Sequence, residues 1–347
     1  MSSTPATSQK QEIVLAYPDE WNYPLDKRQL SPEVDREVGT WMDHLGLVSS
    51  DLDRETYSAI MGASKFALYC YPSADVDRQT VIGKMLAVWT RHDDQIEGHG
   101  ISDWEADVLG RAASGDLPEP SFDNRYLHGW WEVGQAFRAA AMSPHWRQRL
   151  GTHVTAWYRG TNGEAALASR CDPPPTLDEY LPVRRGITGQ TIWLHLAQYG
   201  TDRELPEHAY GTEVEEFHYL AEHFAALYND IFTVGKDAKS NFPNAVSILA
   251  REQEISWTQA ALHLADLHAS TVARWSALEQ TLLSTEPSLA WWVQTARNNV
   301  AGETLALYRA TRYFSPPTAP DGSPFPYYPS LRLGARTVDP RPGEGYV

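Results

Sequence analysis

The fold is constrained most by a succession of long helical stretches that are separated by proline and glycine breaks. Apolar residues recur at helical spacing in segments that include 33–45, 53–69, 75–97, 123–141, 145–168, 176–199, 212–239, 256–285 and 287–313. Hard breaks such as Asp172–Pro175 separate neighbouring segments. No run shows sustained period-two alternation flanked by hairpin turns. The sequence therefore predicts an all-α fold, a single large bundle of about ten to twelve helices.

The two ends of the chain differ from its middle. Residues 1–22 form a polar stretch that becomes extended near Ile13, and we expect them to form an N-terminal tail. Whether this tail caps the site is left open. Residues 314–347 are rich in proline and glycine, and we expect a tail that packs over the surface or stays disordered. Nothing between them resembles a linker, so residues 23–313 are expected to form one domain.

Composition excludes several classes of function. The net charge of −16 argues against a protein that grips nucleic acid, although an anionic ligand bound through metal ions remains compatible with it. The two cysteines, Cys70 and Cys171, show no metal-binding spacing, which favours a reduced, cytoplasmic chain. We expect no membrane-spanning segment and no signal peptide. The sequence leaves open whether the protein forms a homodimer.

One helix carries a stripe of oxygen ligands. Asn229, Thr233 and Asp237 are spaced four residues apart, so they lie almost above one another on a helix. Lys236 falls back onto nearly the same stripe, two turns after Asn229. Oxygen ligands beside a lysine are typical of a hard cation that is bound together with a phosphate, although a polar helix face would explain the motif equally well if it stood alone.

A second acidic motif ends the helix predicted for residues 75–97. Asp93 and Glu97 share a face, Asp94 follows Asp93, and Leu86 and Trp89 lie on the same stripe before them. Acidic residues at a helix C-terminus oppose the macrodipole, so they are mildly unfavourable there unless a cation is present. This face, which runs from apolar to acidic, is typical of a helix that lines an apolar pocket and ends at its charged rim.

Together these motifs resemble those of bacterial class I terpene synthases. Residues 93–97 are similar to the aspartate-rich metal motif of that family, and residues 229–237 to its second metal motif, with lysine before the final acidic residue. Residues 184–189, RRGITG, resemble the arginine-containing helix break that senses diphosphate, and Arg312–Tyr313 matches the pair that ends the last helix. The resemblance spans roughly residues 60–313 and implies the class I α-fold of isoprenoid synthases.

The resemblance implies a substrate, metals and site residues. The substrate would be an allylic isoprenyl diphosphate, ionised and cyclised to a terpene with release of diphosphate. Three Mg²⁺ ions, with Mn²⁺ as an alternative metal, would bind through the cluster Asp93, Asp94 and Glu97 and through Asn229, Thr233 and Asp237. The diphosphate would receive hydrogen bonds from Arg185, Lys236, Arg312 and Tyr313. The spacing to Thr188 and Gly189 favours Arg185 over Arg184 as the sensor.

The hydrocarbon would need walls that do not react with a carbocation. We expect the pocket to be lined by Phe66, Leu86, Trp89, Thr188, Gly189 and Trp193, with Trp157, Tyr228, Trp291 and Trp292 as further aromatic candidates. Farnesyl diphosphate is the expected substrate, with geranylgeranyl diphosphate as the main alternative and geranyl diphosphate as a weaker one. A chain-elongating prenyltransferase would carry a second aspartate-rich motif where this chain has Asn229. From another class, a non-catalytic helical scaffold remains the alternative.

Overall fold

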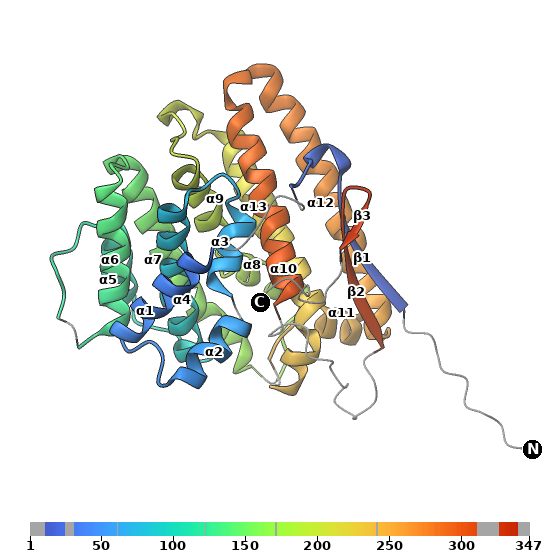
Figure 1. Ribbon diagram of the computed structural model, residues 1–347. Helices are drawn as coiled ribbons and strands as arrows, with labels where there is room; N and C mark the ends of the chain where they lie inside the picture. The colour runs from blue at the N-terminus through green and yellow to red at the C-terminus, as the bar shows by residue number, and fades with distance from the viewer. Residues whose placement is uncertain are drawn as a thin grey trace, which may run out of the picture.

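The computed structural model describes residues 11–24, 31–60, 62–121, 123–170, 172–240, 242–310 and 326–338. Helices dominate, and the predicted all-α bundle is confirmed (Figure 1). The helices are α1 (Pro32–His44), α2 (Asp51–Ile60), α3 (Ala63–Cys70), α4 (Val76–Ile96), α5 (Asp103–Ala113), α6 (Arg125–Ala139), α7 (Pro144–Ala168), α8 (Leu177–Gly186), α9 (Gln190–Gly200), α10 (Thr212–Lys239), α11 (Ala245–Gln253), α12 (Trp257–Thr285) and α13 (Ala290–Arg309). None of these helices combines the length and the apolar character that crossing a membrane requires.

Helix α10 lies in the interior of the bundle. It packs against α8, α9, α11, α12 and α13, and most of its side chains from Val214 to Asp237 are buried. A helix that is apolar nearly all round needs such surroundings, because each buried large side chain contributes about 1.5–3 kcal/mol relative to exposure. Helix α4 faces α1, α3, α6 and α9. The two helices that carry the acidic motifs are therefore both held by packing on several sides.

Local signals fix where the helices near the pocket begin and end. The Asp75 side chain caps α4 by accepting a hydrogen bond from the Arg78 backbone N–H at 2.8 Å. Helix α4 ends at Ile96, and Gly98 follows with φ +78°. Helix α8 ends at Gly186, and Gly189, the N-cap residue that precedes α9, has the left-handed conformation with φ +74°. Because such a φ favours glycine, the glycine in the sequence at this position favours the break between α8 and α9.

A three-stranded sheet, which the sequence pattern did not predict, joins the two ends of the chain. Strand β1 (Gln11–Tyr17) pairs in parallel with β2 (Tyr327–Leu333), and β2 pairs antiparallel with β3 (Arg336–Val338). Strand β1 contains the extended segment expected near Ile13, and its side chains alternate between exposed and buried. A parallel pair made from opposite ends of a chain leaves no hairpin signal, so alternation over one short strand was the only indication available.

The sheet is attached to the bundle by buried hydrogen bonds. The Tyr17 hydroxyl lies 2.7 Å from the Thr304 hydroxyl on α13, and the Tyr327 hydroxyl donates to the Ile231 carbonyl on α10 at 2.9 Å. Strand β1 also packs against α12. The described parts of both end segments therefore contact the helices that surround the site.

Candidate active site

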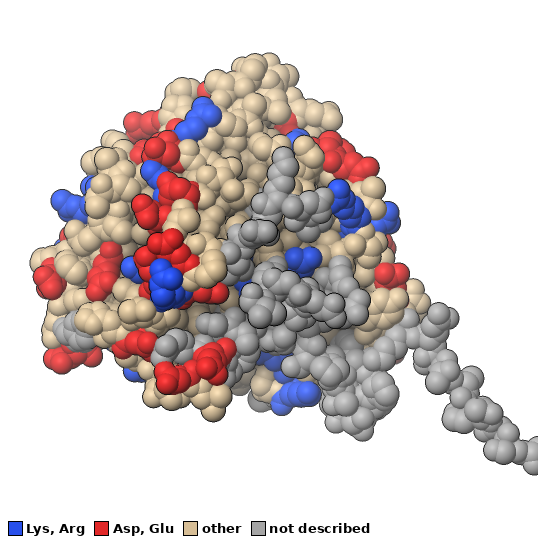
Figure 2. Space-filling model, in the orientation of Figure 1, with Lys and Arg blue, Asp and Glu red and all other residues tan. Residues whose placement is uncertain are grey.

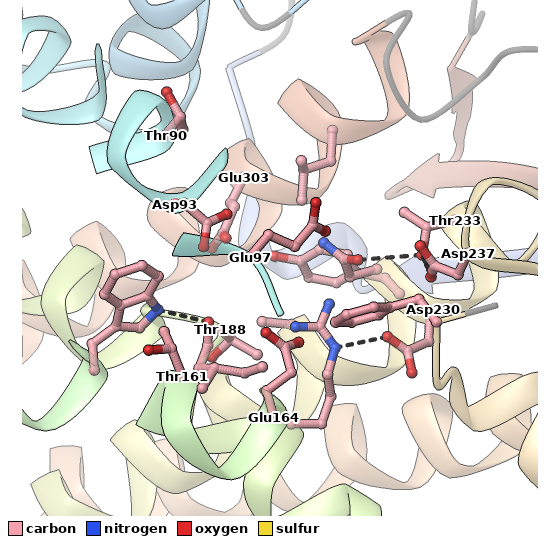
Figure 3. A pocket seen from close by; sticks show the side chains of 18 of the residues that line it. Thr90, Asp93, Glu97, Thr161, Glu164, Thr188, Asp230, Thr233, Asp237 and Glu303 are labelled. Carbon is pink, nitrogen blue, oxygen red and sulfur yellow. Dashed lines mark hydrogen bonds and ion pairs between the residues drawn. The ribbon is translucent and has the colours of Figure 1, made fainter. Parts of the chain in front are cut away.

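A pocket opens between the C-terminal end of α4 and the C-terminal half of α10. Its lining residues come from α3, α4, α7, α8, α9, α10 and α13 and from the segments that follow α8 and α10 (Figure 3). They are Phe66, Leu86, Trp89, Thr90, Asp93, Glu97, Trp157, Thr161, Glu164, Tyr180, Arg184, Ile187, Thr188, Trp193, Ala225, Tyr228, Asn229, Asp230, Thr233, Lys236, Asp237, Phe242, Pro243, Glu303 and Leu307. The mouth is polar and charged, and the deeper wall is mostly aromatic and aliphatic.

The α4 side of the mouth carries two of the three predicted acidic residues. Asp93 and Glu97 both line the pocket, and Leu86 and Trp89 lie below them on the same helix. Asp94 is exposed and does not line the pocket, because the next residue of a helix points about 100° away. The structure thus brings the i, i+4 pair to the site and leaves Asp94 outside it.

Buried hydrogen bonds hold the C-terminal half of α4 in place. His92 Nδ1 lies 2.8 Å from the Tyr158 hydroxyl, which also accepts a hydrogen bond from Trp130 Nε1 at 2.8 Å. Burial lowers the pKa of His92 to about 4, so the imidazole is neutral at neutral pH. His92 therefore adds no positive charge beside the acidic rim, and its contact fixes the rotation of α4 that presents Asp93 to the pocket.

The α10 side carries the predicted oxygen stripe. Asn229, Thr233 and Asp237 all line the pocket, and the Thr233 hydroxyl donates to Asp237 Oδ2 at 2.6 Å while lying 3.5 Å from Asn229 Oδ1. Figure 3 shows Thr233 and Asp237 on one side of the mouth and Asp93 and Glu97 on the other. The carboxylates, the Thr233 hydroxyl and the Asn229 amide offer oxygen atoms to the space between, and hard divalent cations such as Mg²⁺ prefer such ligands. The donor set therefore fits Mg²⁺.

Asn244 supports this stripe and was not predicted. Its side-chain nitrogen donates to Asp237 Oδ2 at 2.8 Å and to the Asp230 carbonyl at 3.0 Å, while its oxygen caps α11 by accepting from the Val246 backbone N–H at 2.9 Å. Burial raises the pKa of Asp237. An amide that orients the buried carboxylate favours its charged form and fixes its free oxygen toward the pocket.

Lys236 connects the two rims. Its Nζ lies 4.0 Å from Glu97 Oε1 and 3.8 Å from Asp237 Oδ1. The side chain is 41% exposed, so these ion pairs contribute little to stability. The lysine is placed to meet an anion between the rims.

The structure places Arg184 at the pocket, whereas the spacing of the motif favours Arg185. Arg184 lines the pocket and its Nε donates to Asp230 Oδ1 at 2.8 Å. The Arg185 guanidinium instead lies over the Tyr219 ring, 4.2 Å from its centroid, and does not line the pocket. Position along α8 decides this, since adjacent residues of a helix point in different directions.

Asp230 is the buried anchor for that arginine. It is 1% exposed, and Oδ2 accepts hydrogen bonds from the Tyr180 hydroxyl and the Ala245 backbone N–H, each at 2.8 Å. These contacts join α8, α10 and α11 around one carboxylate. Because a buried charge is costly unless it is paired, Asp230 holds the Arg184 Nε in place and leaves the terminal nitrogens of the guanidinium at the pocket.

The break between α8 and α9 shapes one wall. Trp157 Nε1 donates to the Ile187 carbonyl at 2.7 Å, and the Thr188 hydroxyl donates to the Arg185 carbonyl at 2.8 Å. Thr188 lines the pocket. Gly189, which was also expected to line the pocket, is not among the lining residues, and a Cβ added to it would come within 2.3 Å of the Trp89 ring. The glycine therefore gives Trp89 the room to face the pocket.

Aromatic rings form the deeper wall. Trp89 stacks on Trp193 with ring centroids 4.8 Å apart and meets Trp157 edge-on at 4.9 Å, while Phe66 lies 4.9 Å from Trp193. Tyr228 completes this group. Two other aromatic candidates lie elsewhere: Trp292 packs against Phe217, and Trp291 lies beneath the Arg203 guanidinium.

Two glutamates in the pocket were not predicted. Glu164 of α7 faces the mouth beside the guanidinium (Figure 3), and burial, opposed by Arg184 and helped by nearby carboxylates, raises its pKa to about 8. Glu303 of α13 is buried, and burial raises its pKa to about 8 as well. Neither residue belongs to a motif, and each reaches the pocket only through the packing of its helix. Arg312 and Tyr313 lie outside the described residues.

Acidic side chains also outnumber basic ones on part of the protein surface. Figure 2 shows them gathered mainly on the side where α1 to α7 lie, with fewer basic side chains among them. An acidic surface repels phosphate backbones, so the ligand of the pocket is expected to be a small molecule.

Comparisons with known proteins identify the family. The model of terpene synthase family 2, C-terminal metal binding, matches residues 84–274, which is more than half of the chain. Among curated relatives, sesquiterpene synthase 6 of Postia placenta is 24% identical over 263 residues, covering 73% of this chain and 77% of the relative. The (2Z,6E)-hedycaryol synthase of Kitasatospora setae is 26% identical over 286 residues, covering 77% of this chain and 82% of the relative.

Solved structures show the same fold. The linalool/nerolidol synthase of Streptomyces clavuligerus superposes with a TM-score of 0.68 at 17% identity, covering 81% of this chain and 98% of that one. An a-eudesmol synthase gives a TM-score of 0.68 at 21% identity, covering 82% of this chain and 97% of that one. At these identities the likeness concerns the fold alone. The matched region contains the α4 and α10 rims described above, and the chain belongs to the terpene synthases, a family of lyases, through the family 2 metal-binding region at residues 84–274.

Proposed function

We propose that this enzyme ionises an isoprenyl diphosphate with the help of Mg²⁺, cyclises the resulting carbocation and releases diphosphate with a terpene hydrocarbon or alcohol. One observation carries the proposal. Two oxygen-rich rims, from α4 and α10, face each other across the mouth of a pocket whose deeper wall is aromatic. A charged mouth above an apolar cavity matches a molecule with a diphosphate at one end and a hydrocarbon at the other.

The metal ligands would come from both rims. Asp93 and Glu97 on α4 and Asn229, Thr233 and Asp237 on α10 supply oxygen atoms, and Asn244 orients the Asp237 carboxylate. When bound, Mg²⁺ supplies charge stabilisation for the departing diphosphate. We keep the expected number of three ions, two on the α4 side and one on the α10 side, and Mn²⁺ as an alternative. Asp94, which is exposed, would take part only by way of water or a shift of the rim.

The diphosphate would be held by cationic side chains. Arg184 takes the sensor role in this proposal, because its guanidinium is fixed by Asp230 at the pocket while Arg185 is engaged with Tyr219. Arginine suits the task through its planar fork of donors, and Lys236 adds a point charge between the rims. For Arg312 and Tyr313 the same role stays an expectation from the sequence.

The aromatic wall would protect and stabilise the carbocation. A desolvated cation over an aromatic face gains on the order of 1–2 kcal/mol, and the rings of Trp89, Trp193 and Phe66 contact one another along the cavity. Their tight packing also keeps water from the cation. These rings would therefore shape the hydrocarbon chain of the substrate as it cyclises, without offering a nucleophile.

Farnesyl diphosphate is the substrate that we favour. One of the two relatives compared above is named as a sesquiterpene synthase, and sesquiterpenes derive from farnesyl diphosphate. Geranylgeranyl diphosphate remains the second candidate.

The experiment is direct. The enzyme is incubated separately with geranyl, farnesyl and geranylgeranyl diphosphate, with Mg²⁺ or with EDTA, and released diphosphate and volatile products are measured. We expect Mg²⁺-dependent release of diphosphate and a cyclic product from farnesyl diphosphate. No release from any of the three would refute the proposal, and a cyclic product from geranylgeranyl diphosphate alone would correct the substrate.

A further inference from the structure

Glu303 is a carboxyl group that the proposed ionisation does not use. It lines the pocket from α13, while the metal-rim residues come from α4 and α10. It is 4% exposed, and its neighbours along the wall include the apolar side chain of Leu307 and the ring of Tyr228. Figure 3 shows it behind the mouth, on a different helix from either rim. A carboxyl group in such a wall faces the hydrocarbon part of a ligand.

Two polar atoms at this place lack a hydrogen bond of ordinary geometry within the described part of the chain. Glu303 Oε2 and the Tyr228 hydroxyl are both buried, and the two side chains lie close enough for a weak hydrogen bond that acts on the pKa of each. Among the described residues, Glu303 also forms no ion pair with a lysine, arginine or histidine. Buried polar groups are nearly always satisfied, and an exception in a binding pocket indicates a functional use.

The surroundings of Glu303 keep its carboxyl protonated. Among the described residues, the titratable groups that face it are Tyr228 of α10, Tyr17 of β1 and Tyr71 after α3, and burial raises the pKa of each of them. All three are neutral near neutral pH, so none offers a cation to a carboxylate. Burial correspondingly raises the pKa of Glu303 to about 8. The group rests as a neutral acid at the edge of an apolar cavity.

We propose that Glu303, on the basis of the proposed function above, is an internal acid–base residue that passes a proton to a neutral hydrocarbon intermediate and takes one back. The inference deepens the proposed cyclisation by naming the residue that moves protons in the cavity. Tyr228 is a positioning residue in this scheme, because its hydroxyl lies within reach of the Glu303 carboxyl and can donate to the carboxylate that forms.

The steps balance in atoms and electrons. The first carbocation loses a proton to the released diphosphate and becomes a neutral polyene. The O–H bond of Glu303 then breaks as its proton adds to one carbon of a carbon–carbon double bond, whose π electrons form the new C–H bond. A second carbocation remains beside the carboxylate. The carboxylate takes a proton from a carbon next to the cationic centre, the C–H electrons form a new double bond, and Glu303 is protonated again.

The test is a single-turnover reaction in D₂O with unlabelled farnesyl diphosphate and enzyme in excess, so that every Glu303 carries deuterium at the start. Carbon-bound deuterium in the product is counted by mass spectrometry, and released diphosphate is measured in parallel. Wild type should give one carbon-bound deuterium per product molecule. Glu303→Gln should give a deuterium-free polyene for the diphosphate that it releases, because the amide keeps the shape of the side chain but is not an acid.

Control variants separate this role from a structural one. Glu222 of α10 is also largely buried with a raised pKa, but it accepts a hydrogen bond from Thr191 at 2.6 Å and does not line the pocket, so Glu222→Gln should keep the labelled product. Tyr228→Phe should lower the labelled fraction in favour of the polyene.

The outcomes distinguish the two proposals. Diphosphate release with a deuterium-free wild-type product overturns the role of Glu303 alone. Retention of the labelled product by a folded Glu303→Gln variant overturns it too. Absence of diphosphate release from every substrate overturns the proposed function and this inference with it.

Discussion

Exchanging the two neighbouring arginines for lysine separates a diphosphate ligand from a surface residue. Arg184→Lys keeps the positive charge but removes the 2.8 Å hydrogen bond from Nε to Asp230 and the planar fork beyond it. A hydrogen bond to a charged group is worth about 1.5–3 kcal/mol, so kcat/KM for diphosphate release should fall roughly 10- to 150-fold. Arg185→Lys keeps the charge and alters the contact with the partly exposed ring of Tyr219, where a cation–π contact is worth about 0.5–1 kcal/mol and is partly kept by lysine.

Lysine is preferred to alanine at residue 184 for a reason of stability. Asp230 is 1% exposed, and Arg184→Ala would leave its carboxylate buried without a cation, at a cost of about 3–5 kcal/mol. That variant could lose activity by unfolding. With lysine at either position, the melting temperature shows whether the fold is kept, and initial rates of diphosphate release report the site.

The result that would refute this reasoning is a reversed order. If Arg185→Lys loses activity as strongly as Arg184→Lys or more, while both variants melt like wild type, then the motif spacing identifies the sensor correctly and the described side-chain placement does not. We expect less than about a threefold loss for Arg185→Lys, since a fraction of a kcal/mol corresponds to no more than that.

Three further predictions follow from the geometry. Gly189→Ala should destabilise the protein by about 1–2 kcal/mol from its left-handed backbone alone, and further from the clash with the indole behind it, whereas Gly186→Ala, which meets nothing within 4 Å, should melt within a degree or two of wild type. Asn244→Ala should weaken Mg²⁺ activation by about 10- to 100-fold, because it releases the Asp237 carboxylate, and an unchanged Mg²⁺ dependence would contradict that role. Burial raises the pKa of Glu303 to about 8, so its contribution to stability is present in acid and lost as the pH rises through that value. Glu303→Gln should therefore gain in melting temperature relative to wild type between about pH 5 and pH 8, and a pH-independent difference would show that the carboxyl is charged throughout.

The sequence was sufficient for the parts of this site that repeat along one helix. Asn229, Thr233 and Asp237 could be grouped because four-residue spacing places them on one face, and the same logic joined Asp93 to Glu97 and both to Trp89. The all-α class followed from periodicity in the same way. Each of these inferences needs only the geometry of a single helix.

Residues that meet through tertiary packing could not be found in this way. Glu164, Asn244 and Glu303 approach the pocket from three different helices or their caps, and no spacing in the sequence links them to the rims. The choice between Arg184 and Arg185 depends on the rotation of α8 about its axis, which the packing around Asp230 sets. The β1–β2 pair likewise depends on contact between opposite ends of the chain.

The most direct test of the central proposal is whether Mg²⁺ and diphosphate stabilise the protein jointly. A ligand at a hundred times its Kd stabilises the folded state by about 2.7 kcal/mol, which for a chain of this size raises Tm by several degrees. We predict that inorganic diphosphate with Mg²⁺ raises Tm markedly more than either alone, and that Asp93→Ala and Asn229→Ala each abolish both this joint rise and the release of diphosphate from substrate. Absence of a joint rise in wild type, or retention of both properties in the two variants, would contradict a diphosphate and metal site between α4 and α10.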